Sequence, residues 1–197
     1  MQENAERIKS LTDGAFILDD AMETFTYAGG RDLTGYVDGT ANLSQEESPV
    51  VALVESGEGL AGSSFVAVQR WEHDLARFRS HSQTQRDDMI GRSIDTNEEL
   101  DDAPKSAHVK RTAQEEFEPE AFMVRRSMPW ATAHGQGLEF ISYGKSLDAF
   151  EQVLCRMVGL DDGITDVLFT FSRPVTGGYY WCPPVQSGRL DLSYLGL

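Results

Sequence analysis

The chain has 197 residues, of which 17 are basic and 32 are acidic, so its formal net charge is −15. Hydrophobic residues make up 40% and aromatic residues 10%, which is typical of a folded globular protein rather than a disordered one. Phosphate groups and anionic lipids are bound by basic surfaces, so this charge argues against a nucleic-acid or membrane partner.

Neither the hydropathy nor the cysteine content indicates a membrane or an oxidising compartment. No apolar run reaches the length of about 18 residues that a membrane-spanning helix needs. The polar residues 1–7 lack the apolar centre of a signal peptide. Cys155 and Cys182 are isolated and make no disulfide framework, so we expect reduced thiols in a cytoplasmic protein.

The beginning of the chain predicts only a fragment of a domain. Residues 3–24 predict a helix followed by a second short helix, although Asp13-Gly14 interrupts the apolar period. Residues 25–27 predict a short strand, and residues 28–49 have the glycine-rich, polar composition of a linker. This part of the sequence supplies no partner strands for its own strand.

A more complete α+β unit is predicted from Gly57 onward. The expected elements are a strand at 64–74, a helix at 75–92, an acidic irregular insert at 93–107, strands at 121–127 and 137–143, a helix capped by Ser146, and a last strand at 167–171. This β–α–β–β–α–β order predicts the ferredoxin-like fold, in which four antiparallel strands carry two helices on one face.

Three short patterns contain side chains suited to chemistry. Asp38 lies between glycines in residues 35–39, where turned backbone lets a carboxylate face a ligand; an ordinary turn aspartate is the alternative. Arg125 and Arg126 are adjacent on a predicted strand, so one points inward, unless both extend to solvent. Phe140 lies on an alternating strand, where plain core packing is the alternative role.

The four histidines are His73, His81, His108 and His134. No two of them have the spacing of a zinc site, and both cysteines are isolated, so no zinc site is expected. A single axial histidine to haem needs no second local ligand, so spacing leaves that role open. The alternative for each histidine is a solvent-facing or hydrogen-bonded imidazole.

Five fragments taken together resemble a known family. In chain order they are GYVDG, SAHVKRT, RRSMPW, GLEFISYG and TDVLFTFSRPVTGGYYWCPP. The series resembles the dye-decolorizing (DyP-type) haem peroxidases, most of all their bacterial cytoplasmic branch, from residue 10 to the end. The resemblance implies a ferredoxin-like domain of the dimeric α/β barrel superfamily. It divides the chain into a remnant of a first such domain at 1–34, a distal loop and linker at 35–56, and a haem-binding domain at 57–197.

The resemblance also implies roles for single residues around haem b. His108 corresponds to the axial ligand of the haem iron, and Asp166 to the carboxylate behind that ligand. Asp38 and Arg125 correspond to the catalytic aspartate and arginine on the peroxide side. Further cofactor contacts are implied for Arg111, at a haem propionate, and for Ser127, Phe140 and Asn42.

The function implied by the resemblance is an oxidoreductase that reduces hydrogen peroxide and oxidises dyes, phenols or other aromatic donors through a ferryl intermediate. Asp38 would act as base and then acid, and Arg125 would stabilise charge on the leaving oxygen. Candidates for passing electrons to bulky donors are Trp130, Trp181, Tyr179 and Tyr180, with packing as the alternative. A haem-handling protein, deferrochelatase-like or catalytically impaired, and a non-haem interaction module are the other functions that the sequence leaves open.

Three features bear on how the chain departs from the family pattern and on its partners. Relatives commonly read GTENP where this chain reads Gly39-Thr40-Ala41-Asn42-Leu43, a change expected to alter a propionate or metal contact. Most of a first domain is absent from the sequence, so an unpaired helix and an open sheet edge predict exposed apolar surface and a homo-oligomer. The tail at 187–197 resembles tails by which some relatives enter an encapsulating shell protein; packing on the domain or on a neighbouring subunit is the alternative.

Overall fold

The computed structural model describes residues 2–197, with side chains from residue 4 onward. Its centre is a four-stranded antiparallel sheet with the strand order β2-β3-β1-β4. The strands are β1 (Ser64–His73), β2 (Val124–Ala131), β3 (Gln136–Gly144) and β4 (Ser172–Cys182). This order is the one that a β–α–β–β–α–β chain produces, so the ferredoxin-like prediction is confirmed.

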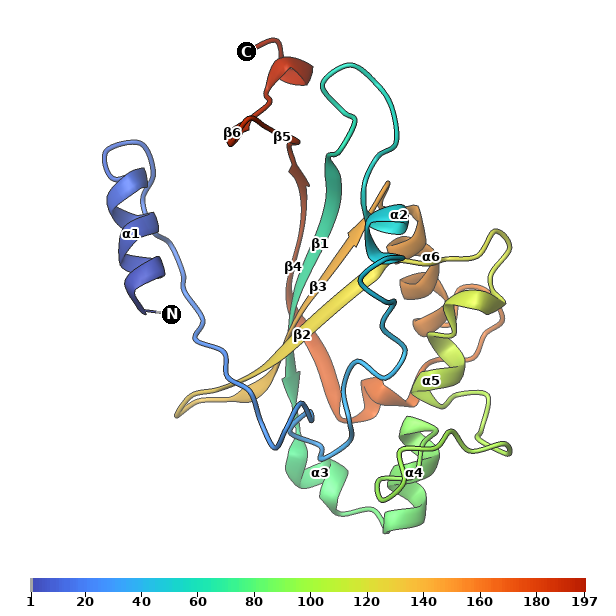
Figure 1. Cartoon of the computed structure of the whole chain (residues 1–197). Helices are drawn as coiled ribbons and strands as arrows, with labels where there is room; N and C mark the ends of the chain where they lie inside the picture. Colours follow the sequence, from blue (N-terminus) through green and yellow to red (C-terminus); the bar gives the residue numbers. More distant parts are fainter. Residues whose placement is uncertain (1) are drawn as a thin grey trace.

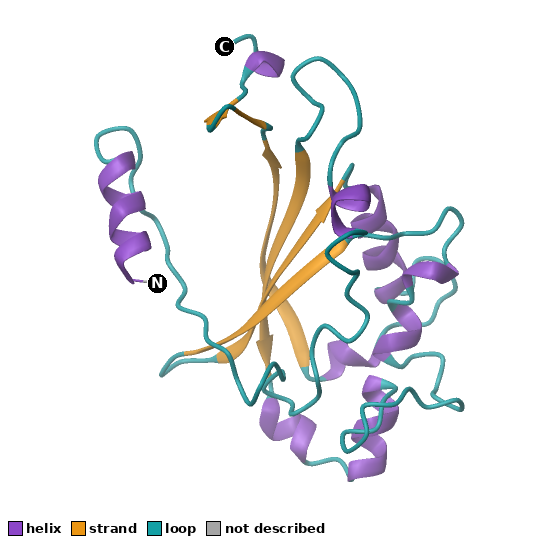
Figure 2. Ribbon diagram, in the orientation of Figure 1, coloured by secondary structure: helices purple, strands orange, loops and turns teal. Residues whose placement is uncertain are grey.

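The helices of the main body gather on one side of the sheet, as Figure 2 shows. They are α2 (Ser48–Ala52), α3 (Leu75–Arg79), α4 (Gln83–Ile90), α5 (His108–Arg111) and α6 (Asp148–Met157), with 3₁₀ turns at Gln114–Glu116, Val167–Thr170 and Ser193–Leu195. A small ribbon of β5 (Val185–Gln186) and β6 (Arg189–Leu190) follows the sheet. None of the helices that the structure describes is long and apolar enough to cross a membrane.

The N-terminal segment differs from the prediction. Helix α1 runs over Gln2–Thr12 and ends before Gly14, whose φ of +83° is left-handed backbone that favours glycine. The remainder of the predicted second helix is extended chain. The predicted strand at 25–27 is reduced to isolated bridges, one of which joins Thr24 to Trp130. In Figure 1, α1 stands apart from the sheet at the end of this arm.

The single helix predicted at 75–92 is two helices. Ser82 interrupts it because its hydroxyl accepts the backbone N–H of Gln85, and the Gln85 side chain accepts the N–H of Ser82. This reciprocal capping box starts α4 in a new direction. Gly91, with φ of +90°, ends α4 in left-handed backbone.

The last strand begins later than predicted. Asp166 accepts the N–H of Leu168 and caps a 3₁₀ turn, so the residues predicted as strand at 167–171 fold as that turn. Strand β4 instead runs over Ser172–Cys182 and contains Pro174 and Gly177-Gly178. It is an edge strand, and Pro174 lies at a register shift opposite β1, where a missing N–H costs little.

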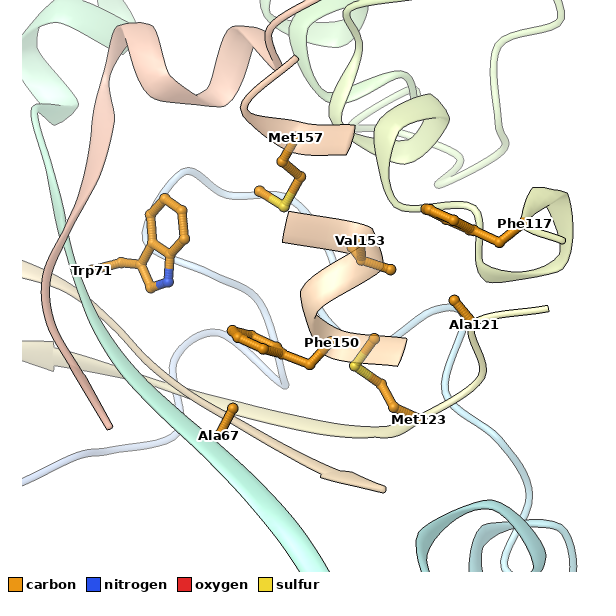
Figure 3. Close-up of a cluster of buried hydrophobic side chains, with 8 residues drawn as sticks. All are labelled: Ala67, Trp71, Phe117, Ala121, Met123, Phe150, Val153 and Met157. Atoms are coloured by element: carbon orange, nitrogen blue, oxygen red, sulfur yellow. The ribbon is translucent and has the colours of Figure 1, made fainter. Parts of the chain in front are cut away.

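The main core lies between the sheet and α6. Phe150, Val153 and Met157 follow one face of α6 at helical spacing and meet Trp71 and Ala67 of β1, as Figure 3 shows. A second cluster at one end of the sheet joins Tyr36, Phe78, Met89 and Phe171. Both clusters consist of residues from 36 to 171, while the domain limits at 1–34 and 35–56 stay predictions.

Candidate functional site

A cavity lies between the sheet and the helical layer. Its wall is mainly apolar and includes Trp71, Leu138, Phe140, Phe150, Val153 and Met157. The sheet, the loop before it and α5 each contribute polar side chains to the wall, among them Asp32, Asp38, His73, His108, Arg125 and Ser172. Such a combination of apolar wall and few convergent polar groups is typical of a ligand site.

His108 is the first residue of α5, and its side chain is held by Asp166. The Nδ1 atom of His108 lies 2.8 Å from Oδ2 of Asp166, whose side chain is fully buried. Backbone bonds fix both partners, because the N–H of Asp166 donates to Met157 and the N–H of Val167 donates to Ser106, two residues before His108. The loop before the 3₁₀ turn is thus fastened to α5 and to the end of α6.

This pair determines which nitrogen of His108 is free. An ionised carboxylate can only accept hydrogen bonds, so the proton of a neutral His108 ring resides on Nδ1. The lone pair of Nε2 is then left for the cavity that His108 lines. A neutral imidazole oriented by a carboxylate is the arrangement of an axial metal or haem ligand.

Asp38 reaches the cavity from the glycine-containing loop that follows the N-terminal arm. Its backbone N–H donates to the carbonyl of Gly30 at 3.1 Å, which closes the loop. Its carboxylate accepts a hydrogen bond from the hydroxyl of Ser127 on β2. Asp38 and Ser127, 89 residues apart in the sequence, are therefore direct neighbours, so the loop carboxylate is in place beside the sheet.

Arg125 lines the same cavity, and Arg126 lies on the opposite, exposed face of β2. The strand alternation predicted this division. Burial lowers the pKa of the Arg125 guanidinium, and the carboxylates of Asp38 and Glu115 oppose that shift. Arginine stays charged even so, and among the described residues its guanidinium makes no hydrogen bond. A buried cation beside a carboxylate is thus available to a ligand in the cavity.

The comparisons with known proteins match this geometry. The family model described as "Dyp-type peroxidase, C-terminal" matches residues 29–187. The chain belongs to the Dyp-type peroxidase family. Among curated relatives, the dye-decolorizing peroxidase of Mycolicibacterium paratuberculosis is 34% identical over 191 residues, which are 93% of this chain and 54% of that protein. The protein of the same name from Mycobacterium tuberculosis is 34% identical and covers 91% of this chain and 55% of its own length.

Solved structures of Dyp-type proteins share the fold. A Dyp-type protein from Shewanella oneidensis superposes with a TM-score of 0.88 at 32% identity, over 93% of this chain and 61% of that chain. A DypB variant from Rhodococcus jostii in complex with heme gives a TM-score of 0.84 at 30% identity, over 93% and 61%. The chain spans about half the length of the curated relatives it matches.

Four residues that the Dyp-type resemblance assigned to the cofactor do not line the cavity. Ser127 and Asp166 are hydrogen-bonded to the lining residues Asp38 and His108, whereas Arg111 and Asn42 are not. Arg111 is buried, donates two hydrogen bonds of 2.8 Å to Asp162 and donates two more to the carbonyl of Arg156. The guanidinium predicted for a haem propionate is therefore used to tie α5 to the end of α6, because Asp162 offers it a bidentate partner. Asn42 is exposed on the loop and packs against Gly39.

The other predicted residues are brought together. Phe140 lines the cavity from β3 and packs 6.4 Å, ring centre to ring centre, from Phe150 of α6. Ser127 makes its contact through Asp38, as described above. Of the eight residues assigned from the sequence, the two that lie outside the cavity wall and its hydrogen-bonded neighbours are Arg111 and Asn42.

Sequence reasoning did not assign three polar residues of the cavity wall. Asp32, His73 and Ser172 form one hydrogen-bonded group there. The sequence signal was the period of two in β1, which puts residue 73 on the same face as Ala67 and Trp71. Burial raises the pKa of Asp32, and the hydrogen bond and charge of His73 together with the hydrogen bonds of Thr34 outweigh it, so the pKa lies below the ordinary aspartate value.

Proposed function

We propose that this chain binds haem b in the cavity, with His108 as the axial ligand, and acts as a peroxidase on hydrogen peroxide and aromatic donors. The observation that carries the proposal is that the His108–Asp166 pair reaches the same cavity as Asp38 and Arg125. An imidazole that is oriented by a carboxylate is suited to bind iron. A carboxylate beside a cation is suited to transfer the protons of hydrogen peroxide.

The residues of the cavity fit haem in two respects. The wall is mainly aromatic and aliphatic, which suits a flat, largely apolar macrocycle. Nε2 of His108 offers the nitrogen donor that one axial position requires, whereas both ring nitrogens of His73 are hydrogen-bonded to Ser172 and Asp32. Bound haem would supply the iron that reacts with peroxide and the oxidising equivalents that oxidise the aromatic donor.

The protein residues would supply the proton transfer. Asp38 would accept a proton from the peroxide oxygen nearer the iron and return it to the farther oxygen, which then leaves as water. The Ser127 hydroxyl holds the Asp38 carboxylate through Oδ2 and leaves Oδ1 for this work. Arg125, as a buried cation, would stabilise negative charge on the leaving oxygen more strongly than it would in water.

His108 and Asp166 would hold the haem iron as a pair. The buried Asp166 carboxylate holds the Nδ1 proton and gives the imidazole more anionic character. A more electron-rich nitrogen favours higher oxidation states of the metal it binds. Asp166 is thus assigned to orient and tune the ligand, while His108 touches the cofactor.

Aromatic donors too large for the cavity would be oxidised at the surface. Tyr179 on β4 is 51% exposed, and its ring packs edge-on against Phe150 at 5.9 Å between ring centres. Phe150 lines the cavity, so these two rings connect it with the surface. Of the four aromatic residues considered as routes for electrons, Trp130 is buried. We propose Tyr179 as the surface residue at which the donor is oxidised.

The surroundings of the protein are part of the same proposal. Leu11, Phe16, Ile17 and Leu18 are exposed on the N-terminal arm, which supports a homo-oligomer. The two free cysteines support a cytoplasmic location. Leu195 and Leu197 are exposed in the tail, which is the feature available to an encapsulating shell protein.

The test is an absorption spectrum of the full chain with added haem b, before and after one equivalent of hydrogen peroxide. A Soret band that shifts with peroxide and returns when an aromatic donor is added is the expected result. A band that peroxide only bleaches would favour a haem-handling protein. A spectrum identical to that of free haem would overturn the proposal, and His108→Ala serves as the matched control.

A further inference from the structure

Asp32 is the centre of the loop that carries Asp38. Its backbone N–H donates to Tyr36 at 2.9 Å, and its carbonyl accepts the N–H of Gly35 at 2.8 Å. Its Oδ2 accepts the backbone N–H of Thr34 at 2.8 Å and the Thr34 hydroxyl at 2.5 Å. All four of these bonds are within the loop, so Asp32 determines the loop's internal shape.

The fifth bond of Asp32 leaves the loop. Its Oδ1 lies 3.3 Å from Nε2 of His73, near the end of β1. The Nδ1 atom of His73 lies 2.7 Å from the hydroxyl of Ser172, which is the residue paired with it on β4. His73 and Ser172 are both buried, so the ring is held from the sheet side and cannot turn away without losing a bond.

The partners of His73 define its hydrogen-bonding roles. The Asp32 carboxylate can only accept, so Nε2 must carry a proton. The Ser172 hydroxyl can donate to Nδ1 or accept from it, so the neutral and the charged ring are both satisfied. The contact between β1 and the loop thus persists in either charge state of the ring.

From this geometry we propose that His73 is a positioning residue, which acts through Asp32 to hold the Asp38 loop against the sheet. The loop closes on itself through the bond from the Asp38 N–H to Gly30, and it meets β2 through Ser127. His73 supplies the contact to β1 on the other side. The inference rests on the role of Asp38 in the proposed function, whereas the contacts themselves do not depend on it.

The loop has a second anchor, on the helical layer. The Tyr36 hydroxyl donates to Oδ1 of Asp87 at 2.5 Å, which fastens the same loop to α4. Tyr36 connects the loop to the helical layer, and His73 connects it to strand β1 of the sheet. The two anchors therefore hold different sides of the loop. Removing His73 should therefore loosen the loop on the side of β1, while α4 and Ser127 of β2 still hold it.

The experiment is amide hydrogen exchange of residues 30–38 in the full chain, measured with and without haem. His73→Phe keeps a flat ring of similar size beside Phe171, 6.3 Å away, but removes the donor to Asp32. We expect exchange of these residues to accelerate about tenfold, as loss of one hydrogen bond to a charged group would produce. His73→Gln, whose amide N–H can reach Asp32, should restore most of the protection.

Two controls separate this effect from general loss of stability. Exchange of β2 and β3 should stay unchanged in His73→Phe. His81→Gln, a change at a ring whose Nδ1 lies 3.0 Å from the Arg77 carbonyl oxygen, should leave the loop protected. If His73→Phe does not fold, His73→Leu removes the same donor and leaves the bonds between Asp32 and Thr34 in place. Unchanged loop exchange in the folded variants would overturn the proposal.

The two proposals fail separately. If the unchanged haem-loaded chain shows no reaction with peroxide while loop exchange still accelerates in His73→Phe, the catalytic role of Asp38 is rejected and the positioning role of His73 is kept. A protected loop in His73→Phe would reject the role of His73, whatever the activity of the haem-loaded chain.

Discussion

Asp166 accepts the Nδ1–H of His108 at 2.8 Å from a fully buried position. The same carboxylate accepts the backbone N–H of Leu168 with its other oxygen, also at 2.8 Å. Both oxygens are thus satisfied by fixed donors, and the carboxylate cannot rotate without breaking one bond. The fold of the turn after α6 consequently determines the orientation of the His108 ring.

The first prediction concerns this pair. Asp166→Asn keeps the volume but removes the charge and offers only one acceptor oxygen for two donors. We expect haem to be retained, with its affinity or the rate of reaction with peroxide reduced by about 10–100-fold. Haem titration and stopped-flow absorption measure these quantities. His108→Ala should lose haem altogether, and a normal Soret band in that variant would refute the ligand assignment.

The second prediction compares two adjacent arginines. Arg125→Leu should retain haem and slow the reaction with peroxide by about a hundredfold, because a buried cation beside Asp38 is lost. Arg126→Leu removes the same charge from the exposed face of β2 and should change the rate little. The measurement is the rate of the spectral change at several peroxide concentrations. Equal rates in the two variants would remove Arg125 from the mechanism.

The third prediction concerns Arg111. Its bidentate contact with Asp162 and its bonds to the Arg156 carbonyl assign it to the packing of α5 on α6. Arg111→Met should lower the midpoint of thermal unfolding by several degrees and leave the affinity for haem close to that of the unchanged chain. A variant of normal stability with weakened haem binding would instead support the propionate contact that the resemblance implies for Arg111.

The fourth prediction is a pH dependence of stability. The pKa of Asp32 is lowered in the folded protein, since the hydrogen bonds and charge around it outweigh burial. Its contribution to the free energy of unfolding is therefore fully present above the unfolded aspartate pKa of about 3.9, and it is lost as the pH falls through the folded value. Asp32→Asn should be less stable at neutral pH and lose less stability on acidification.

Denaturant unfolding of the two proteins between neutral and acid pH measures that difference directly. The same comparison with Asp13→Asn, a change at an exposed aspartate, controls for the many other carboxylates of the chain. Parallel stability curves for Asp32→Asn and the unchanged chain would show that ionisation of Asp32 adds no stability to the folded protein.

The sequence predicted the parts of the fold that depend on local patterns. The alternation in β1 and β3 and the spacing of Phe150, Val153 and Met157 identified those elements, because one buried face leaves its period in the sequence. It was wrong at residues 167–171, where a capping carboxylate outweighs the β propensity of an apolar run. It was also wrong about a second short helix before residue 24, where the chain is not helical.

By itself, then, the sequence determined the antiparallel α+β plan, the inward orientation of one arginine of an adjacent pair, and a family resemblance that pointed to His108 and Asp38. The tertiary structure alone decided that Arg111 faces Asp162 and that His73 holds Asp32. The reason is that strand and helix periods act over a few residues. The partners of Asp32 and Arg111 lie 41 and 51 residues away in the sequence, so only the tertiary packing brings them together.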